Sequence, residues 1–121
     1  MTVAWRDYRS APAPGTPVCA VPGAGAVACV RLSGAQGVFP MIVVGVADGV
    51  RAWVNACPHQ YLPLDYRSAS ILSADGARLM CSAHGAQFDA ATGCGVAGEG
   101  VGCALDPVPV AVIDGRVVIA G

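Results

Sequence analysis

Three stretches of the chain share one pattern of apolar and polar positions. In each, an apolar or alternating run is followed by an Asp-Gly pair and then by a second such run. The three pairs are Asp48-Gly49, Asp75-Gly76 and Asp114-Gly115. An Asp-Gly pair between such runs is the strongest short-range signal for a β-hairpin. The pattern therefore predicts hairpins over residues 43–55, 70–81 and 108–120.

The segments between these hairpins contain further strand and loop signals. Apolar residues near 18–21 and 27–32 predict additional strands, whereas the Pro, Gly and Ala of residues 11–26 indicate mostly turns and loops. Five glycines lie within residues 93–104, which predicts a second long loop. No helical period extends beyond about two turns. We expect one all-β domain over residues 1–121, built as an antiparallel β-sandwich or barrel.

Composition narrows the classes of function. The chain has 121 residues, of which 55% are hydrophobic and 12% charged, and its formal net charge is −1. A chain without a basic excess is not expected to bind nucleic acid. Disordered chains combine low hydrophobicity with high net charge, and this chain shows the opposite. We therefore expect a compact domain.

No membrane or export segment is predicted. The most apolar stretch, Val38–Ala47, has about ten residues, whereas a spanning helix needs about twenty. The first ten residues carry no apolar run behind their charges, and Arg6 and Arg9 are not adjacent, so neither a signal peptide nor a twin-arginine signal is expected. The prediction is a cytoplasmic protein without a membrane partner. In a reducing cytosol the six cysteines indicate metal ligands and buried thiols rather than disulfides.

The only two histidines each lie beside a cysteine. Cys57-Pro-His59 follows the second arm of the first hairpin, and Cys81-Ser-Ala-His84 follows the second arm of the second hairpin. Two such loops can face each other and hold a metal centre. The set suits a tetrahedral zinc site, or a two-iron cluster with two cysteines on one iron and two histidines on the other. Structural zinc sites usually take a same-type pair from each loop, so the mixed pairs favour the cluster.

The residues around these pairs resemble the Rieske [2Fe–2S] family. The matching segments, from about Val38 onward, are 52–56, Cys57-Pro-His59 with Pro63-Leu64, Cys81-Ser-Ala-His84-Gly85, Gln87-Phe88-Asp89, Thr92-Gly93 and 107–120. The resemblance implies a Rieske-like sandwich with a small cluster-binding part over about residues 55–95, and one [2Fe–2S] cluster per chain. It also implies that Cys57 and Cys81 bind the inner iron, and that His59 and His84 bind the outer, solvent-facing iron.

Two segments depart from the family pattern. The 21 residues between His59 and Cys81 exceed the usual spacing by several, and we expect the hairpin at Asp75-Gly76 to absorb them. The family's proline-containing loop over the cluster is replaced by the glycine-rich residues 93–102.

Four single positions bear on the reduction potential. High-potential relatives carry Ser and Tyr where this chain has Ala86 and Phe88, and a loop disulfide where it has Leu62 and Ala83. Because hydrogen bonds to the sulfurs stabilise the reduced state, the resemblance implies a low-potential cluster.

Features that this chain is not predicted to have indicate which branch of the family it resembles. Without a predicted anchor or loop disulfide, the chain does not resemble respiratory-complex proteins, and its length leaves no room for an oxygenase's catalytic domain. We expect a monomeric ferredoxin, not itself an enzyme. It would carry single electrons from an NAD(P)H-dependent reductase to a terminal ring-hydroxylating oxygenase, docking transiently near His59 and His84. An apolar collar around these ligands would comprise Pro58, Tyr61, Leu62 and Pro63.

Three other functions stay open from the sequence. The chain also suits the small subunit of an assimilatory nitrite reductase, a zinc-stapled interaction module, or a redox sensor that uses the spare thiols. These thiols, Cys19, Cys29, Cys94 and Cys103, are read as ordinary buried or surface residues, and a Cys94–Cys103 bridge is conceivable. Trp5 and Trp53 are core candidates, and Leu64 is either core or part of a docking surface.

Overall fold

The structure, a computed structural model, describes residues 5, 8–57, 63–68, 70–82, 85–98 and 101–120. These residues form strands and connecting turns, without an α-helix. The strands are β1 (Pro17–Ala20), β2 (Val27–Gly34), β3 (Gly37–Val46), β4 (Gly49–Val54), β5 (Arg78–Met80), β6 (Gln87–Asp89), β7 (Gly95–Ala97), β8 (Val110–Ile113) and β9 (Arg116–Ile119). The predicted all-β class is confirmed.

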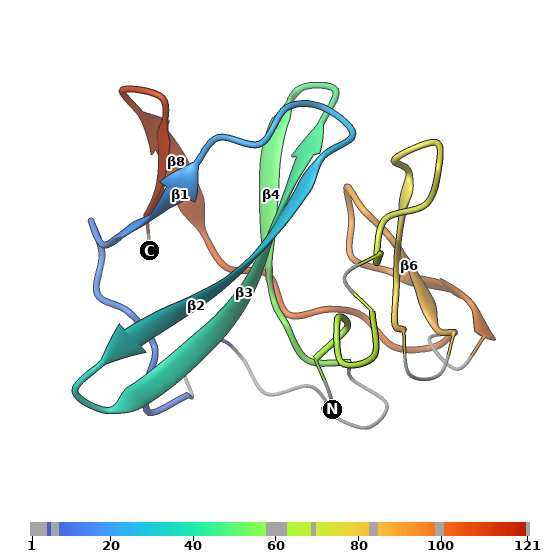
Figure 1. The fold of residues 1–121 in the computed structure, drawn as a ribbon, viewed down its shortest axis with the longest axis horizontal. Helices are drawn as coiled ribbons and strands as arrows, with labels where there is room; N and C mark the ends of the chain where they lie inside the picture. Colours follow the sequence, from blue (N-terminus) through green and yellow to red (C-terminus); the bar gives the residue numbers. More distant parts are fainter. Residues whose placement is uncertain are drawn as a thin grey trace.

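The strands form three antiparallel sheets of three strands each, in the orders β1-β9-β8, β2-β3-β4 and β5-β6-β7. Figure 1 shows the β2-β3-β4 sheet between the other two. The three predicted hairpins are present. The third closes at Asp114 and Gly115, whose φ angles of 51° and 77° fit the left-handed turn that Asp-Gly favours. In the second, Leu72 bridges Leu79, the Ser73 N–H donates to the Arg78 carbonyl (2.9 Å) and the Met80 N–H donates to the Ile71 carbonyl (2.6 Å).

The central strand β3 is buried on both faces. Met41 and Val43 face a core shared with the β1-β9-β8 sheet, which also holds Val117 and Ile119. The alternate residues of β3 face a second core, shared with the β5-β6-β7 sheet. This explains why residues 38–47 are almost continuously apolar, because a strand covered on both sides has no polar face.

The glycine-rich residues 93–104 were expected to be a long loop, and this was wrong in part. Strand β7 lies within them and pairs with β6, with a register shift between Gln87 and Phe88. Glycine keeps its backbone N–H, so it can extend a ladder wherever a neighbouring edge offers partners. The Gly95 N–H, for example, donates to the Cys103 carbonyl (2.9 Å).

The two cysteines of this segment, Cys94 and Cys103, do not form a disulfide in the structure. Cys94 pairs with Ala104 across an antiparallel bridge. Cys94, Cys103, Cys19 and Cys29 are all free thiols in the structure.

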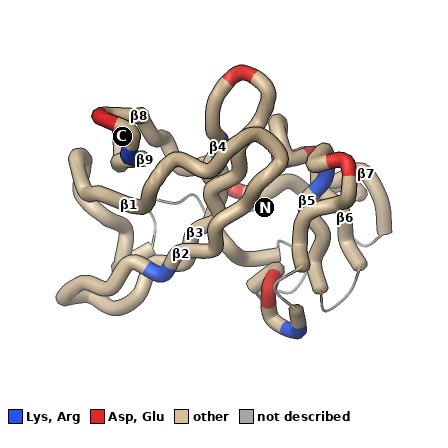
Figure 2. The backbone as a smooth tube through the Cα atoms, turned by 45° about the horizontal axis from the view of Figure 1, so that its top comes forward, with Lys and Arg blue, Asp and Glu red and all other residues tan. Residues whose placement is uncertain are grey.

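Charges are few and dispersed over the described residues. Figure 2 shows them scattered over separate turns and strands, without a continuous basic stripe in this part of the molecule. The described residues also include no helix with the length and apolarity needed to span a membrane. Trp5 and Trp53 are buried, as predicted, and Leu64 belongs to the core.

Candidate metal centre

The two cysteines predicted as ligands lie in one buried region. Cys57 follows the end of β4, and Cys81 directly follows β5. Their exposed fractions are 0% and 1%, and both belong to the apolar core that also contains Trp53 and Phe88. Strands from two different sheets therefore deliver the two sulfurs to the same apolar environment.

The structure describes only some of the remaining predicted site residues. His59 and His84 lie outside the described residues, as do Pro58, Tyr61 and Leu62. Pro63 is half-buried, and Leu64 is fully buried in the same core as the cysteines.

Asn55 anchors the loop that follows Cys57. It is a buried polar residue at the end of β4, with an exposed fraction of 2%. Its Oδ1 accepts a hydrogen bond from the Leu64 N–H (2.7 Å), and its Nδ2 donates to Asp65 Oδ1 (3.0 Å). Burying an amide costs free energy unless its groups are paired, and here both ends of the side chain are.

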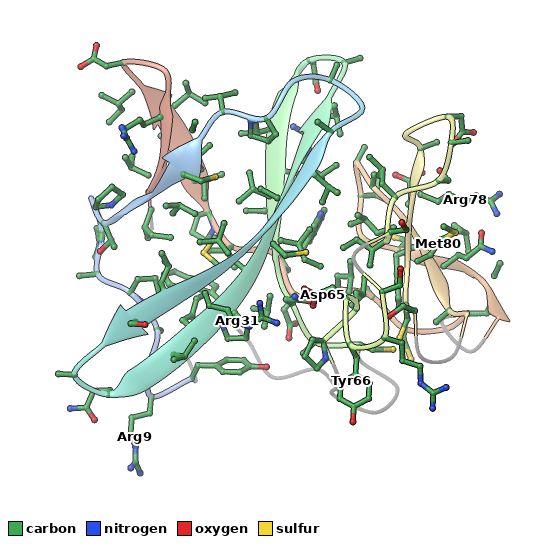
Figure 3. The ribbon with its side chains drawn as sticks, viewed as in Figure 1. Arg9, Arg31, Asp65, Tyr66, Arg78 and Met80 are labelled. Carbon is green, nitrogen blue, oxygen red and sulfur yellow. The ribbon has the colours of Figure 1, made fainter. Side chains whose placement is uncertain are left out.

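Asp65 extends this anchor to the central sheet. Its carboxylate lies 3.6 Å from the Arg31 guanidinium of β2 and is 14% exposed, and Figure 3 shows the two side chains directed toward each other. Cys29, also on β2, lies beside it. Burial, together with the charge and hydrogen bond of Asp65, raises the pKa of the Cys29 thiol to about 11, although the Arg31 charge acts to lower it.

Two backbone hydrogen bonds join Cys81 to Gly85 and Ala86, across the loop that follows it. The Cys81 N–H donates to the Ala86 carbonyl (2.8 Å), and the Gly85 N–H donates to the Cys81 carbonyl (2.9 Å). The chain turns back on itself at Gly85, whose φ is 73°. Ser82, within this loop, binds the backbone of the other loop at Leu64.

Ala86 and Phe88 are both fully buried in the core that contains Cys57 and Cys81. Neither side chain carries a hydrogen-bond donor. The structure thus places the two substituted positions in the same core as the cysteines.

A third connection joins the central sheet to the β5-β6-β7 sheet. Arg51 of β4 donates from Nε to the Ala91 carbonyl (3.2 Å). Ala91 lies in a turn held by Asp89, whose Oδ1 accepts the N–H groups of Ala91 and Thr92.

Sequence reasoning did not single out Asn55, Asp65, Ser82 or Arg51. Asn55 carried a usable signal, because an amide at the end of an apolar strand is buried only if it is paired. The other three give no local signal of these connections between segments, since Asp65 pairs with Arg31, Ser82 with residues 64–68 and Arg51 with Ala91, all distant in the sequence.

The described donors fit the thiolate half of an iron–sulfur site. Such clusters are held by cysteine thiolates, and the apolar shell around them restricts solvent access. Cys57 and Cys81 fit both requirements, since each is a cysteine that follows a strand and is buried in the same apolar core.

The comparison with protein families decides the identity of the fold. The Rieske [2Fe–2S] domain model matches residues 16–111. The chain belongs to the Rieske [2Fe–2S] family. Its cofactor is a [2Fe–2S] cluster. The match begins well before Val38, so the family likeness includes β1 and β2.

Solved structures agree with this Rieske assignment. One chain of the complex of reduced oxygenase and oxidized ferredoxin in carbazole 1,9a-dioxygenase is 28% identical, with a TM-score of 0.66 over 87% of this chain and 91% of that one. The Sphingomonas yanoikuyae B1 ferredoxin is 26% identical, with a TM-score of 0.66 over 88% and 98%. A protein described as a nitrite reductase NADPH small subunit shares the fold at 16% identity (TM-score 0.61, 90% and 100%). No curated protein matches the sequence.

Proposed function

We propose that this Rieske protein is a ferredoxin that carries single electrons from an NAD(P)H-dependent reductase to a terminal ring-hydroxylating oxygenase. The observation that carries the proposal is the likeness to the Sphingomonas yanoikuyae B1 ferredoxin, which extends over 98% of that chain. A second similar chain comes from a complex of an oxygenase with its ferredoxin. The proposed carrier is a single-domain monomer of the cytoplasm, and it is not itself an enzyme.

In this proposal four residues hold the cluster. Cys57 and Cys81, buried in one core, bind the inner iron, and His59 and His84 bind the outer iron. The cluster supplies a one-electron couple. The chain contributes two buried sulfurs, an apolar shell and two loops joined by hydrogen bonds. Reductase and oxygenase dock in turn near His59 and His84, with the small contact area expected of redox encounters.

The ligand set is tested by Cys57→Ser and Cys81→Ser, with Cys94→Ser as the matched control at an exposed thiol. We expect both ligand variants to lose the visible spectrum and most of their iron and sulfide. The control should keep both, and the parent should accept one electron per chain in a reductive titration. Full retention of iron and sulfide in either ligand variant would refute the assignment.

A second candidate is the small subunit of a nitrite reductase, favoured by the structural likeness to a protein so described. The two functions differ in the protein that accepts the electron. The reduced protein should be reoxidised by a ring-hydroxylating oxygenase and not by a nitrite reductase large subunit. An oxygenase gene beside this gene would agree with that outcome, and a nitrite-reductase gene would oppose it. Zinc in place of iron in the purified protein would exclude both.

A further inference from the structure

The hydroxyl group of Ser82 connects the two loops that carry the cysteines. Ser82 Oγ donates to the Leu64 carbonyl (2.7 Å) and accepts the N–H groups of Arg67 (2.9 Å) and Ser68 (3.2 Å). The Ser82 N–H also donates to the Leu64 carbonyl (2.8 Å). One residue, directly after Cys81, therefore makes four hydrogen bonds to the segment that follows Cys57.

Leu64 is held from the opposite side as well. Its N–H donates to Asn55 Oδ1 (2.7 Å), and Asn55 lies two residues before Cys57. Leu64 is fully buried and packs in the same core as both cysteines. A continuous path of hydrogen bonds thus runs from the end of β4, through Asn55, Leu64 and Ser82, to Cys81.

The three side-chain hydrogen bonds at position 82 require a hydroxyl group. A serine hydroxyl offers one donor and two acceptor lone pairs, and all three are used here. Alanine offers none of them, whereas threonine offers the same three. The backbone bond from residue 82 to Leu64 does not depend on the side chain.

We propose that Ser82 is a positioning residue that sets the separation of the Cys57 and Cys81 loops and thereby the geometry of the cluster between them. The inference rests on the proposed ligand roles of Cys57 and Cys81. Removing the hydroxyl takes this acceptor from the Arg67 and Ser68 N–H groups and leaves the Leu64 carbonyl with only the Ser82 N–H of its two Ser82 donors. The loops then open more often and the two sulfurs lose their fixed spacing.

The test compares Ser82→Ala with Ser82→Thr in the full chain. Ser68→Ala is the matched control, because among the described residues the Ser68 hydroxyl accepts from the Ser70 N–H (3.1 Å), within its own loop, and makes no hydrogen bond to the Cys81 loop. Three quantities are measured: the rate of iron release to a chelator, hydrogen exchange at the Arg67 and Ser68 amides, and the electron paramagnetic resonance signal of the reduced cluster with its midpoint potential.

In Ser82→Ala we expect iron release and exchange at both amides to be faster by about tenfold, as the loss of hydrogen bonds of ordinary strength allows. The resonance signal and the midpoint should shift. Ser82→Thr should stay within about twofold of the parent, and Ser68→Ala should match it. A Ser82→Ala protein that assembles no cluster supports the proposal if Ser82→Thr assembles one.

Three outcomes would overturn the proposal. In the first, Ser82→Ala releases iron and exchanges its amides at the parental rates. In the second, Ser82→Ala releases iron faster but keeps the resonance signal and midpoint potential of the parent. In the third, Ser82→Thr is as impaired as Ser82→Ala. Failure of the proposed function is a separate result. It would appear as zinc, or as no iron and sulfide, in the parent protein, while amide exchange at Arg67 and Ser68 would still report on the connection between the loops.

Discussion

At the scale of single residues, two side chains in the core around the cysteines lack a hydrogen-bond donor. Ala86 and Phe88 are fully buried in the core that contains Cys57 and Cys81, and neither side chain can donate a hydrogen bond. Hydrogen bonds to cluster sulfur stabilise the added charge of the reduced state and raise the potential. We therefore expect these two apolar side chains to keep the reduction potential of the proposed carrier low.

The prediction is a midpoint potential below about +100 mV at pH 7, toward the low end of the Rieske range of roughly −150 to +300 mV. Ala86→Ser combined with Phe88→Tyr should raise the midpoint by about 60 mV, which corresponds to a tenfold change for one electron. Ala90→Ser is the control, since Ala90 is buried in the same core. Protein-film voltammetry measures all three. An unchanged midpoint in the double variant would show that these donors do not set it.

Cys29 makes stability depend on pH in the alkaline range. Its thiol has an ordinary pKa of 9.0, raised in the folded protein to about 11 by burial and by Asp65. Above pH 9 the unfolded chain releases this proton before the folded chain does. The contribution of Cys29 is therefore complete below pH 9 and is lost as the pH rises toward 11. Cys19, whose pKa burial also raises, acts in the same direction.

We therefore expect the urea midpoint of unfolding to fall between pH 8.5 and about 10.5, and to fall less in Cys29→Ala. Asp65 and Arg31, the charged groups that act on this thiol, are unchanged in the variant. Equal alkaline losses in the two proteins would argue against a role for Cys29.

At the scale of elements, close backbone contacts hold segments that the strands alone do not connect. Residues 22–26 cross β3 at Gly45, where the Gly25 N–H donates to the Gly45 carbonyl (3.0 Å) and the Gly45 N–H donates to Ala26 (2.9 Å). A Cβ on Gly45 would overlap the Gly23 carbonyl and approach the Pro22 oxygen to 2.7 Å. Only a residue without a side chain permits this crossing.

Gly45→Ala should therefore destabilise the protein by about 3 kcal/mol, since neighbouring backbone has to move. Gly34→Ala is the matched control: it lies at the end of β2, and its added Cβ would meet nothing closer than 3.9 Å. Chemical denaturation of the two variants separates steric overlap from a general cost of losing glycine. Similar stabilities would contradict the crossing.

At the scale of the whole molecule, two cores lie on opposite sides of one sheet. The core toward β1-β9-β8 contains Phe39, Met41, Val117 and Ile119 and neither of the proposed ligand cysteines. The other core contains both of these cysteines. Over the described residues the two cores have no member in common and meet at the β2-β3-β4 sheet, so loss of the cluster should affect them unequally.

Removal of the cluster by chelation under reducing conditions is expected to loosen the β5-β6-β7 sheet and to leave the β8–β9 hairpin folded, because metal binding is linked to the folding of the loops that supply the ligands. Amide exchange should increase by at least about tenfold at Leu79 and Phe88 and stay low at Val117 and Ile119. Uniform exchange through both cores, or no change in either, would contradict this division.

Local features of the sequence determined much of this fold. Each Asp-Gly turn depends on residues adjacent in the chain, so all three hairpins were predictable from their own segments. The Cys57 and Cys81 pairs follow hairpin arms, and this indicated that both would reach one site. Glycine content misled the prediction for residues 93–104, because backbone pairing of β7 depends on the edge of β6 and not on its own composition.

Only the tertiary structure decided which sheets meet and what connects the two loops. The apolar run of β3 is compatible with several burial patterns, and its two-sided burial follows from sheets on either side. Ser82 gives no sign in the sequence of its bonds to Leu64, Arg67 and Ser68, 14 to 18 residues earlier. Contacts of this kind depend on how distant segments are brought together, and residue type and local spacing do not carry that information.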